Sequence, residues 1–216
     1  MSRPKPNRTA QHAPITIVNV GYRSTNYWVI SAGTSRLLVD IGWPGTFGML
    51  KAQLTHKGIP LHELRYALAT HYHIDHAGVA QDMKHAGVPL LVVDVQVAAI
   101  PLMKQWTKPW DHYVDITATG NTVVACADSR RLLQHIGIAG EIIHTPGHSD
   151  HCVSVLLDDG SVFSGDLPAE TIAFDNPLAL ASWQVLRAHG ATRVYPAHGP
   201  VRHIDAGYDA SEEAHT

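Results

Sequence analysis

The stretch HYHIDH, residues 71–76, places three histidines and one aspartate within six residues. In an extended backbone, side chains two residues apart point to the same side, so His71 and His73 can converge on one metal ion. If the chain then enters a helix at Asp75, this residue and His76 are presented at the helix start and can hold a second ion beside the first. The stretch therefore predicts a compact metal site, because a string of this kind is too specific for chance to explain it well.

The residues around this stretch predict a strand, a loop, a helix and a second strand, in that order. RYALAT at 65–70 is an apolar run typical of a strand, and it leads directly into the histidines. A helical pattern follows and ends near Gly87, and PLLVV at 89–93 predicts the next strand. The candidate ligands therefore lie on a loop at the end of a strand.

Three more candidate ligands occur later in the chain, each just after a run typical of a strand. His148 lies in TPGHS, Asp166 in SGD and His198 in PAHG. Side chains that follow strand ends can gather at one rim of a sheet, where a rigid scaffold holds them in place. An adjoining glycine permits a tight turn beside each of them: Gly147, Gly165 and Gly199.

The rest of the chain repeats this plan of strands covered by helices. In the first half we predict strands at 15–20, 26–31 and 36–40 and a helix at 46–57. In the second half we predict a helix at 128–136, strands at 141–145, 152–157, 161–164 and 192–196, and a helix at 179–189. Strands and helices in both halves indicate an α+β fold of two sheets with helices outside.

The segment between the two halves carries aromatic residues without clear periodicity. Asp94 can begin a short helix that Pro101 limits, and residues 101–121 are then expected to form a long loop or cap. Four residues of this cap either line a substrate pocket or anchor the loop to the core: Trp106, Trp110, His112 and Tyr113. Turns of the first half bring further candidates toward the site: Tyr22, Asn26 and Trp43.

The bulk composition fits one globular domain. With 216 residues, of which 45% are hydrophobic, the chain can bury a sizeable core. We predict a flexible N-terminal tail at 1–13, a domain at 14–205 and a C-terminal tail at 206–216. Cys126 and Cys152 are expected to be buried thiols, because a chain of this size needs no disulfide to hold its core.

The charge distribution argues against several classes of partner. The formal net charge is -3, and lysines and arginines are scattered after a short basic opening, so we do not expect nucleic acid binding. No apolar run follows that opening, so neither a secretory signal nor a membrane span is expected. We predict a cytoplasmic protein that acts on a small molecule; no feature of the sequence predicts its oligomeric state.

Most of the 16 histidines are not expected to bind metal. Five lie on predicted helices or adjoining loops and should be solvated: His56, His62, His85, His135 and His189. His144 and His151 are close to His148 in the sequence. We expect neither to bind metal nor to support a ligand, because His144 alternates along a strand and His151 lies beyond the turn.

The motifs HYHIDH, TPGHS, SGD and PAHG, in this order, resemble the metal motifs of the metallo-β-lactamase superfamily. The resemblance runs from about residue 15 to residue 200 and implies a four-layer αββα sandwich with the metal ions between the sheet edges. The ligands that it implies are His71, His73 and His148 for a first zinc, Asp75, His76 and His198 for a second, and Asp166 as a bridge between both. It also implies that Asp40, in LLVDIG, supports a ligand without binding metal.

Such a centre is suited to hydrolysis. Two metal ions that share a water lower its pKa toward neutrality and produce a hydroxide nucleophile, while an open coordination position polarises the substrate oxygen. We expect two zinc ions per chain, although manganese, iron and cobalt also suit mixed imidazole and carboxylate ligands. Asp75 is the candidate catalytic residue, because its carboxylate can orient the hydroxide and carry a proton to the leaving group.

The resemblance also narrows the range of substrate classes that we expect. Antibiotic-hydrolysing members typically lack the bridging carboxylate, which Asp166 supplies here, so we expect hydrolysis of a small ester, thioester or lactone. The continuation LPAETIAFDNP at 167–177 departs from the pattern of glutathione thioester hydrolases. β-Lactam and phosphodiester hydrolysis are alternatives. A mononuclear-iron persulfide dioxygenase, which fits His71, His76 and Asp166, is another, and a metal-storing module is the last.

Overall fold

The computed structural model describes residues 14–204. The predicted tails at 1–13 and 206–216 lie outside the described residues, and the predicted domain boundaries stay a prediction. Between residues 14 and 204, no helix combines the length and the apolar character that a bilayer crossing requires.

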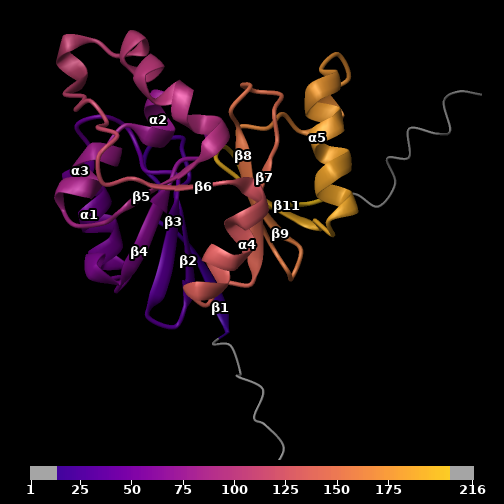
Figure 1. Ribbon diagram of the computed structural model, residues 1–216, viewed down its shortest axis with the longest axis horizontal. Coiled ribbons are helices and arrows are strands. Elements are labelled where there is room, and N and C mark those ends of the chain that lie inside the picture. The colour runs from indigo at the N-terminus through magenta and orange to yellow at the C-terminus, as the bar shows by residue number, and fades with distance from the viewer. Residues whose placement is uncertain (1–13, 205–216) are drawn as a thin grey trace, which may run out of the picture.

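The first sheet has six strands that follow one another in sequence order (Figure 1). They are β1 (Ile15–Asn19), β2 (Trp28–Ala32), β3 (Ser35–Val39), β4 (Leu64–Leu68), β5 (Leu90–Val93) and β6 (Thr122–Val124). The pairs from β1 to β3 are antiparallel and those from β3 to β6 are parallel. β5 is buried along its whole length, as expected of a parallel strand that is covered on both faces.

The second sheet has five strands in the order β11-β10-β9-β8-β7. They are β7 (Gly140–His144), β8 (Val153–Leu157), β9 (Ser161–Gly165), β10 (Arg193–Pro196) and β11 (Arg202–His203). Only β9 and β10 are parallel. The sequence did not predict β6 or β11, because a strand of two or three residues is too short to show periodicity.

Helices cover the outer faces of the two sheets, which pack against each other (Figure 1). The helices are α1 (Phe47–His56), α2 (Ile74–Ala77), α3 (Ala80–His85), α4 (Cys126–His135) and α5 (Pro177–Ala188). In Figure 1, α1 to α3 lie on the side of the first sheet and α5 on the side of the second. α4 packs against β7. These layers confirm the predicted αββα sandwich.

Apolar clusters hold the layers together. Leu37, Leu68 and Leu91 of the first sheet pack between the sheets with Val155 and Phe163 of the second. A second cluster joins the first sheet to α1 and α3, and a third joins the second sheet to α5. The strands that carry the candidate ligands are therefore fixed by burial on both faces.

The cap differs from its prediction. A 3-10 helix, η2 (Asp94–Trp106), continues through Pro101 instead of ending there. Ala99, Ile100 and Met103 are buried on the core, and this burial outweighs the backbone hydrogen bond that proline cannot donate. Three further 3-10 helices are short: η1 (Leu61–Glu63), η3 (Pro109–Asp111) and η4 (Glu170–Ile172).

The two cysteines are free thiols, as predicted. Cys152 is buried, and burial raises its pKa to about 11. Cys126 is only partly buried, which corrects the expectation of two buried thiols, because it opens α4 at the edge of the sandwich. The five histidines that were predicted to be solvated are all exposed.

Candidate metal centre

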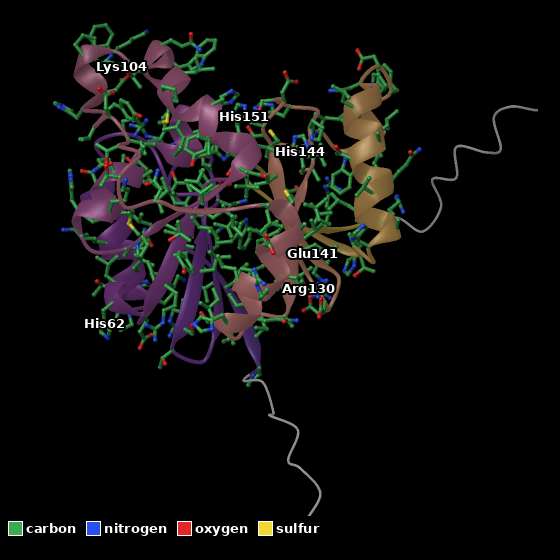
Figure 2. All side chains as sticks on the ribbon, in the orientation of Figure 1. His62, Lys104, Arg130, Glu141, His144 and His151 are labelled. Atoms are coloured by element: carbon green, nitrogen blue, oxygen red, sulfur yellow. The ribbon has the colours of Figure 1, made fainter. Side chains whose placement is uncertain are left out.

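The loops that carry the predicted ligands lie at one end of the sandwich. They are residues 71–76 after β4, His148 between β7 and β8, Asp166 after β9 and His198 after β10. Figure 2 labels His151 at this end, next to the β7–β8 connection, whereas His62 is labelled at the opposite end. The fold thus brings together side chains that are up to 127 positions apart in the sequence.

Three histidines form the first set of candidate ligands. Nδ1 of His73 lies 3.0 Å from Nε2 of His71 and 3.0 Å from Nε2 of His148. His71 is fully buried, whereas the His148 side chain keeps 29% of its surface exposed. Three ring nitrogens therefore point at one position that solvent reaches from the His148 side.

Asp75, His76 and His198 form the second set. Oδ2 of Asp75 lies 3.5 Å from Nε2 of His76 and 3.3 Å from Nε2 of His198. The helix α2 begins at Ile74, directly after His73, and its turn separates the two halves of the HYHIDH motif. The first two histidines of the motif thus belong to one set, and the last two ligands belong to the other.

Asp166 lies between the two sets. Its Oδ2 is 3.9 Å from Nε2 of His71 and 3.5 Å from Nε2 of His148, both in the first set. The same oxygen is 3.3 Å from Nε2 of His76, and Oδ1 is 3.4 Å from Nε2 of His198. One carboxylate therefore reaches donor atoms of both sets, which is the position that a bridging ligand requires.

The donor atoms have the spacing that metal ions need. Zinc bound to nitrogen in a tetrahedron separates its ligand atoms by about 3.3 Å, and the donor pairs described above lie 3.0 to 3.9 Å apart. Nε2 of His76 and Oδ1 of Asp166 are buried and have no hydrogen-bond partner among the described residues. Because such orphaned atoms are costly, a cation in contact with both is a physical reason for their arrangement.

The pKa values of the histidines differ between the sets. Burial lowers the pKa of all three histidines of the first set below 6.5, so they are neutral at pH 7, as metal binding requires. Burial also lowers the pKa of His76, but the carboxylates of Asp40 and Asp166 outweigh it and raise this pKa to about 10. The carboxylates thus favour positive charge at this point, which a divalent cation can supply.

Asp40 orients one ligand of each set. Its Oδ2 lies 3.1 Å from Nδ1 of His76, while its Oδ1 accepts hydrogen bonds from the backbone and hydroxyl of Thr70 at 2.8 and 2.9 Å. The Thr70 hydroxyl in turn lies 3.2 Å from Nδ1 of His71. Asp40 is buried and has a φ of 62°, a conformation that is uncommon outside glycine and often marks functional sites.

The loop between β1 and β2 supports the second set from the opposite side. The hydroxyl of Thr25 donates to Oδ2 of Asp75 at 3.2 Å. Nδ1 of His198 donates to the backbone carbonyl of Ser24 at 2.7 Å, so its Nε2 is the nitrogen left for the metal. This loop therefore fixes both a carboxylate and a histidine of the second set.

Asn26, a predicted candidate for the site, holds the loop of His198. Its side-chain amide donates to the carbonyls of Pro196 and Gly199 at 3.0 and 2.9 Å. The indole of Trp28 donates to the Pro196 carbonyl as well, at 3.0 Å. Asn26 thus positions a candidate ligand through the backbone of its loop.

Gly165 permits the close approach of the two sheets beneath Asp166. It has a φ of +55°, and a Cβ atom here would lie 2.4 Å from Oγ1 of Thr70 and 2.7 Å from its Cβ. All three glycines beside the later ligands have positive φ, as the tight turns predicted there require. A side chain at 165 would displace Thr70, which contacts both Asp40 and His71.

His151 and His144 contact the backbone of the ligand loops and are not among the grouped donors. Nε2 of His151 accepts a hydrogen bond at 3.2 Å from the backbone of Tyr72, which separates His71 from His73. Nε2 of His144 lies 2.7 Å from the Asp150 carbonyl and braces the β7–β8 connection. The sequence did not lead us to expect these contacts, since each depends on how the ligand loops fold back on themselves.

The four predicted residues of the cap do not lie together. Trp106 is 60% exposed, and its ring centroid is 6.5 Å from that of His73, so it stands at the rim of the first set. Trp110 is exposed beneath the Lys108 ammonium, and His112 is exposed as well. Tyr113 packs against the core, where it anchors the cap.

Several supporting residues were not found from the sequence. Gln96 is fully buried, and its amide donates to the carbonyls of Ala69 and Thr70 at 3.0 and 3.1 Å, which fixes the end of β4. Thr70 directly precedes the motif, so its place was a signal that could have been used. Gln96 and Thr25 carry no such signal, because their contacts arise only when distant segments meet.

Comparison with known proteins agrees with this geometry. A family model of the metallo-beta-lactamase superfamily matches residues 20–212. The chain belongs to this superfamily. Most metallo-β-lactamase superfamily members are metal-dependent hydrolases, and the grouped histidines and aspartates of this member can hold metal.

Two curated relatives show how the similarity is distributed. The Beta-lactamase-like protein 2 homolog of Caenorhabditis elegans is 27% identical over 186 residues, which are 83% of this chain and 57% of the relative. The Atrochrysone carboxyl ACP thioesterase nsrC of Aspergillus novofumigatus is 28% identical over 194 residues, which are 83% of this chain and 50% of the relative. The chain thus spans about half the length of the curated relatives that it matches.

A solved structure shares the fold. The FEZ-1 metallo-beta-lactamase from Legionella gormanii aligns with a TM-score of 0.66 at 19% identity, over 91% of this chain and 82% of that chain. This likeness confirms the αββα fold of the superfamily.

Proposed function

We propose that this protein is a hydrolase with two zinc ions per chain that cleaves a small ester, thioester or lactone. The observation that carries the proposal is the position of Asp166, whose two oxygens lie within 3.9 Å of donor nitrogens of both sets. A bridging carboxylate holds two ions close enough to act on one substrate. His71, His73 and His148 would hold the first ion, and Asp75, His76 and His198 the second.

The residues of this chain prepare the site for that chemistry. When bound, two zinc ions activate water near neutral pH and polarise the substrate carbonyl. Asp40 and the Ser24 carbonyl each face Nδ1 of their histidine, His76 and His198, so that Nε2 is the nitrogen directed at the metal position. The same set also suits manganese or iron, so zinc is a proposal that metal analysis tests.

Asp75 is the residue that we propose to move the proton. The Thr25 hydroxyl donates to its Oδ2, which fixes the carboxylate at the rim of the second set. From there Asp75 can orient a water molecule and pass its proton to the leaving group. We expect Asp75→Asn to lower kcat by about 10²- to 10⁴-fold with little change in substrate affinity. Near-wild-type turnover at full metal content contradicts this role.

The acyl group of the substrate is the part that we place against Trp106. The exposed indole stands 6.5 Å from the His73 ring and offers an apolar surface directly beside the first set. Among the relatives are proteins named as ACP thioesterases, which supports a thioester as one substrate class. The low net charge supports a small molecule rather than nucleic acid, and the cytoplasmic location stays a prediction.

One observation favours a second candidate function. His71, His76 and Asp166 form a separate group whose ligand atoms lie within 4.8 Å of one another. Two histidines and one carboxylate are the ligands of many mononuclear iron oxygenases. Iron as the single bound metal, with oxygen consumption on persulfides, would support this function, whereas two zinc ions support hydrolysis.

A substrate screen tests the proposal. The zinc-loaded protein is assayed with p-nitrophenyl esters, lactones, thioesters, β-lactams and bis-p-nitrophenyl phosphate, beside Asp166→Asn and the remote surface variant Asp159→Asn. We expect turnover of an ester, thioester or lactone that falls roughly a hundredfold or more in Asp166→Asn and is unchanged in Asp159→Asn. Turnover of only the β-lactam or the phosphodiester contradicts the proposed substrate class.

A further inference from the structure

Arg23 occupies a strained position in the tight hairpin between β1 and β2. The backbones of Tyr22 and Thr25 pair across a two-residue turn, with hydrogen bonds of 3.1 and 3.3 Å between them. Arg23 is the first of the two turn residues and has a φ of 58°. Glycine is the residue normally found at a position with positive φ in such a turn. A long, charged side chain here is therefore not explained by the turn itself.

Two aromatic rings hold the Arg23 side chain. Its guanidinium carbon lies 5.4 Å from the Tyr22 ring centroid and 5.6 Å from the Trp43 ring centroid, within the range of cation–π contacts. Trp43 belongs to the loop that follows β3, so the contact joins two loops beside the site. The rings restrict the guanidinium to the surface while leaving its hydrogen-bond donors available to a ligand.

The position of Arg23 in the chain places it at the rim of the second set. The next residue, Ser24, accepts the hydrogen bond of His198, and Thr25 donates to the carboxylate of Asp75. The Ser24 carbonyl binds Nδ1 of the His198 ring, and Nε2 of the same ring faces Asp75 in the second set. A substrate bound at the metal centre would therefore have Arg23 close to one of its ends.

Among residues 14–204, no carboxylate lies within ion-pair distance of the Arg23 guanidinium. The residue is also exposed. Asp40, Asp75 and Asp166 supply negative charge that largely offsets two divalent cations in the centre itself. The rim beside the second set is thus left with a positive charge that is free to pair with a ligand.

We propose that Arg23 is a specificity-determining residue that binds an anionic oxygen group of the substrate, a carboxylate or a phosphate. This inference rests on the proposed ester or thioester hydrolysis and names its substrate class. A planar guanidinium pairs with either group through two parallel hydrogen bonds, which an uncharged substrate cannot form. The substrate is then an acyl compound with an anionic arm that reaches the β1–β2 loop.

Two matched substrate pairs test the inference. For the carboxylate, mono-p-nitrophenyl glutarate is compared with p-nitrophenyl pentanoate, which has the same acyl length without the charge. For the phosphate, butyryl-coenzyme A is compared with S-butyryl-N-acetylcysteamine. In Arg23→Gln we expect kcat/KM for the anionic member of at least one pair to fall about tenfold or more, through KM. The neutral members should stay within about twofold of wild type.

Three variants separate charge from folding. Arg23→Gly relieves the positive φ, so its thermal midpoint should not fall, while its preference for the anionic member is lost as in Arg23→Gln. Arg23→Lys keeps the charge without the planar fork and should keep only part of the preference. Arg65→Gln removes an exposed arginine of β4 and should change nothing.

An equal loss on charged and neutral substrates, or no loss on either pair, overturns the inference. A response of the coenzyme A pair alone identifies the phosphate, and a response of the glutarate pair alone identifies the carboxylate. If wild type hydrolyses none of the four compounds, that result counts against the ester and thioester classes of the proposed function and does not bear on Arg23. Calorimetry with the non-hydrolysable thioether S-butyl-coenzyme A then tests Arg23 separately, and equal affinity for wild type and Arg23→Gln overturns the inference there.

Discussion

The substitution Asp40→Asn isolates one contact of the candidate metal centre. Asp40 is buried with a φ of 62°, and asparagine is one of the few residues that adopt this conformation readily. Its side-chain carbonyl can still accept the two hydrogen bonds that Thr70 donates to Oδ1. The change is thus confined to Oδ2, which lies 3.1 Å from Nδ1 of His76.

The expected size of the effect follows from that contact. An amide group in place of Oδ2 presents a donor to Nδ1 of His76, so the histidine proton moves to Nε2, the nitrogen that faces Asp75 and Asp166. This proton must leave before a metal ion can bind. Loss of such a supporting contact lowers metal affinity by about 10- to 100-fold, which corresponds to about 1.4 to 2.7 kcal/mol.

Zinc competition with a chromophoric chelator measures the effect. We expect Asp40→Asn to weaken one of two binding events and to leave the other within about threefold of wild type, because the contact acts on the second set. The thermal midpoint of the metal-free variant shows whether the fold is intact, and Asp159→Asn is the matched control on a remote turn. Two binding events of wild-type affinity in Asp40→Asn would refute the reasoning.

Three further predictions concern stability, pH and substrate. Gly165→Ala should lower the thermal midpoint by several degrees. A left-handed backbone alone costs about 1–2 kcal/mol, and the new Cβ would also lie 2.4 Å from Oγ1 of Thr70. The control Gly87→Ala, at positive φ but in open space, should lower the midpoint less in the same melting experiment. The metal-free protein should be most stable near pH 6.5 in urea titrations. Below this value the unfolded chain takes up protons before the first set, whose pKa values are lowered by burial, so stability falls. Above it the unfolded His76 is neutral while the folded His76, whose pKa is raised to about 10, still holds its proton, so stability falls between pH 6.5 and about 10. A stability that rises steadily from pH 5 to about 10 contradicts the shifts. Trp106→Ala should raise KM for an apolar acyl substrate about tenfold. The melting temperature should hardly change, because the indole is 60% exposed. An unchanged KM would show that Trp106 does not contact the substrate.

The candidate ligands could be predicted because their signals are local. HYHIDH combines residue type with a spacing of two, and the later ligands each follow a strand that burial makes easy to recognise. The fold then needs only to bring the ends of four strands together. Residue types and strand ends therefore predicted the candidate ligands, and the resemblance to the superfamily supplied their division into two sets with Asp166 between them.

The supporting residues and the cap were less predictable because they depend on tertiary contacts. Thr25 reaches Asp75 only when the first sheet brings their loops together, and Ser24 reaches His198 only after the two sheets pack. In the cap, Pro101 is a sound local stop signal, yet η2 continues because its apolar side chains are buried on the core. Sequence pattern thus indicated where the site lies, and packing determined what holds it.

Anomalous diffraction from crystals of the zinc-loaded protein, recorded on both sides of the zinc absorption edge, tests the central claim most directly. We expect two peaks about 3.5 to 4 Å apart, one beside His73 and one beside His198, with Asp166 in contact with both. A single peak, or two peaks without Asp166 between them, would contradict a bridged two-metal centre.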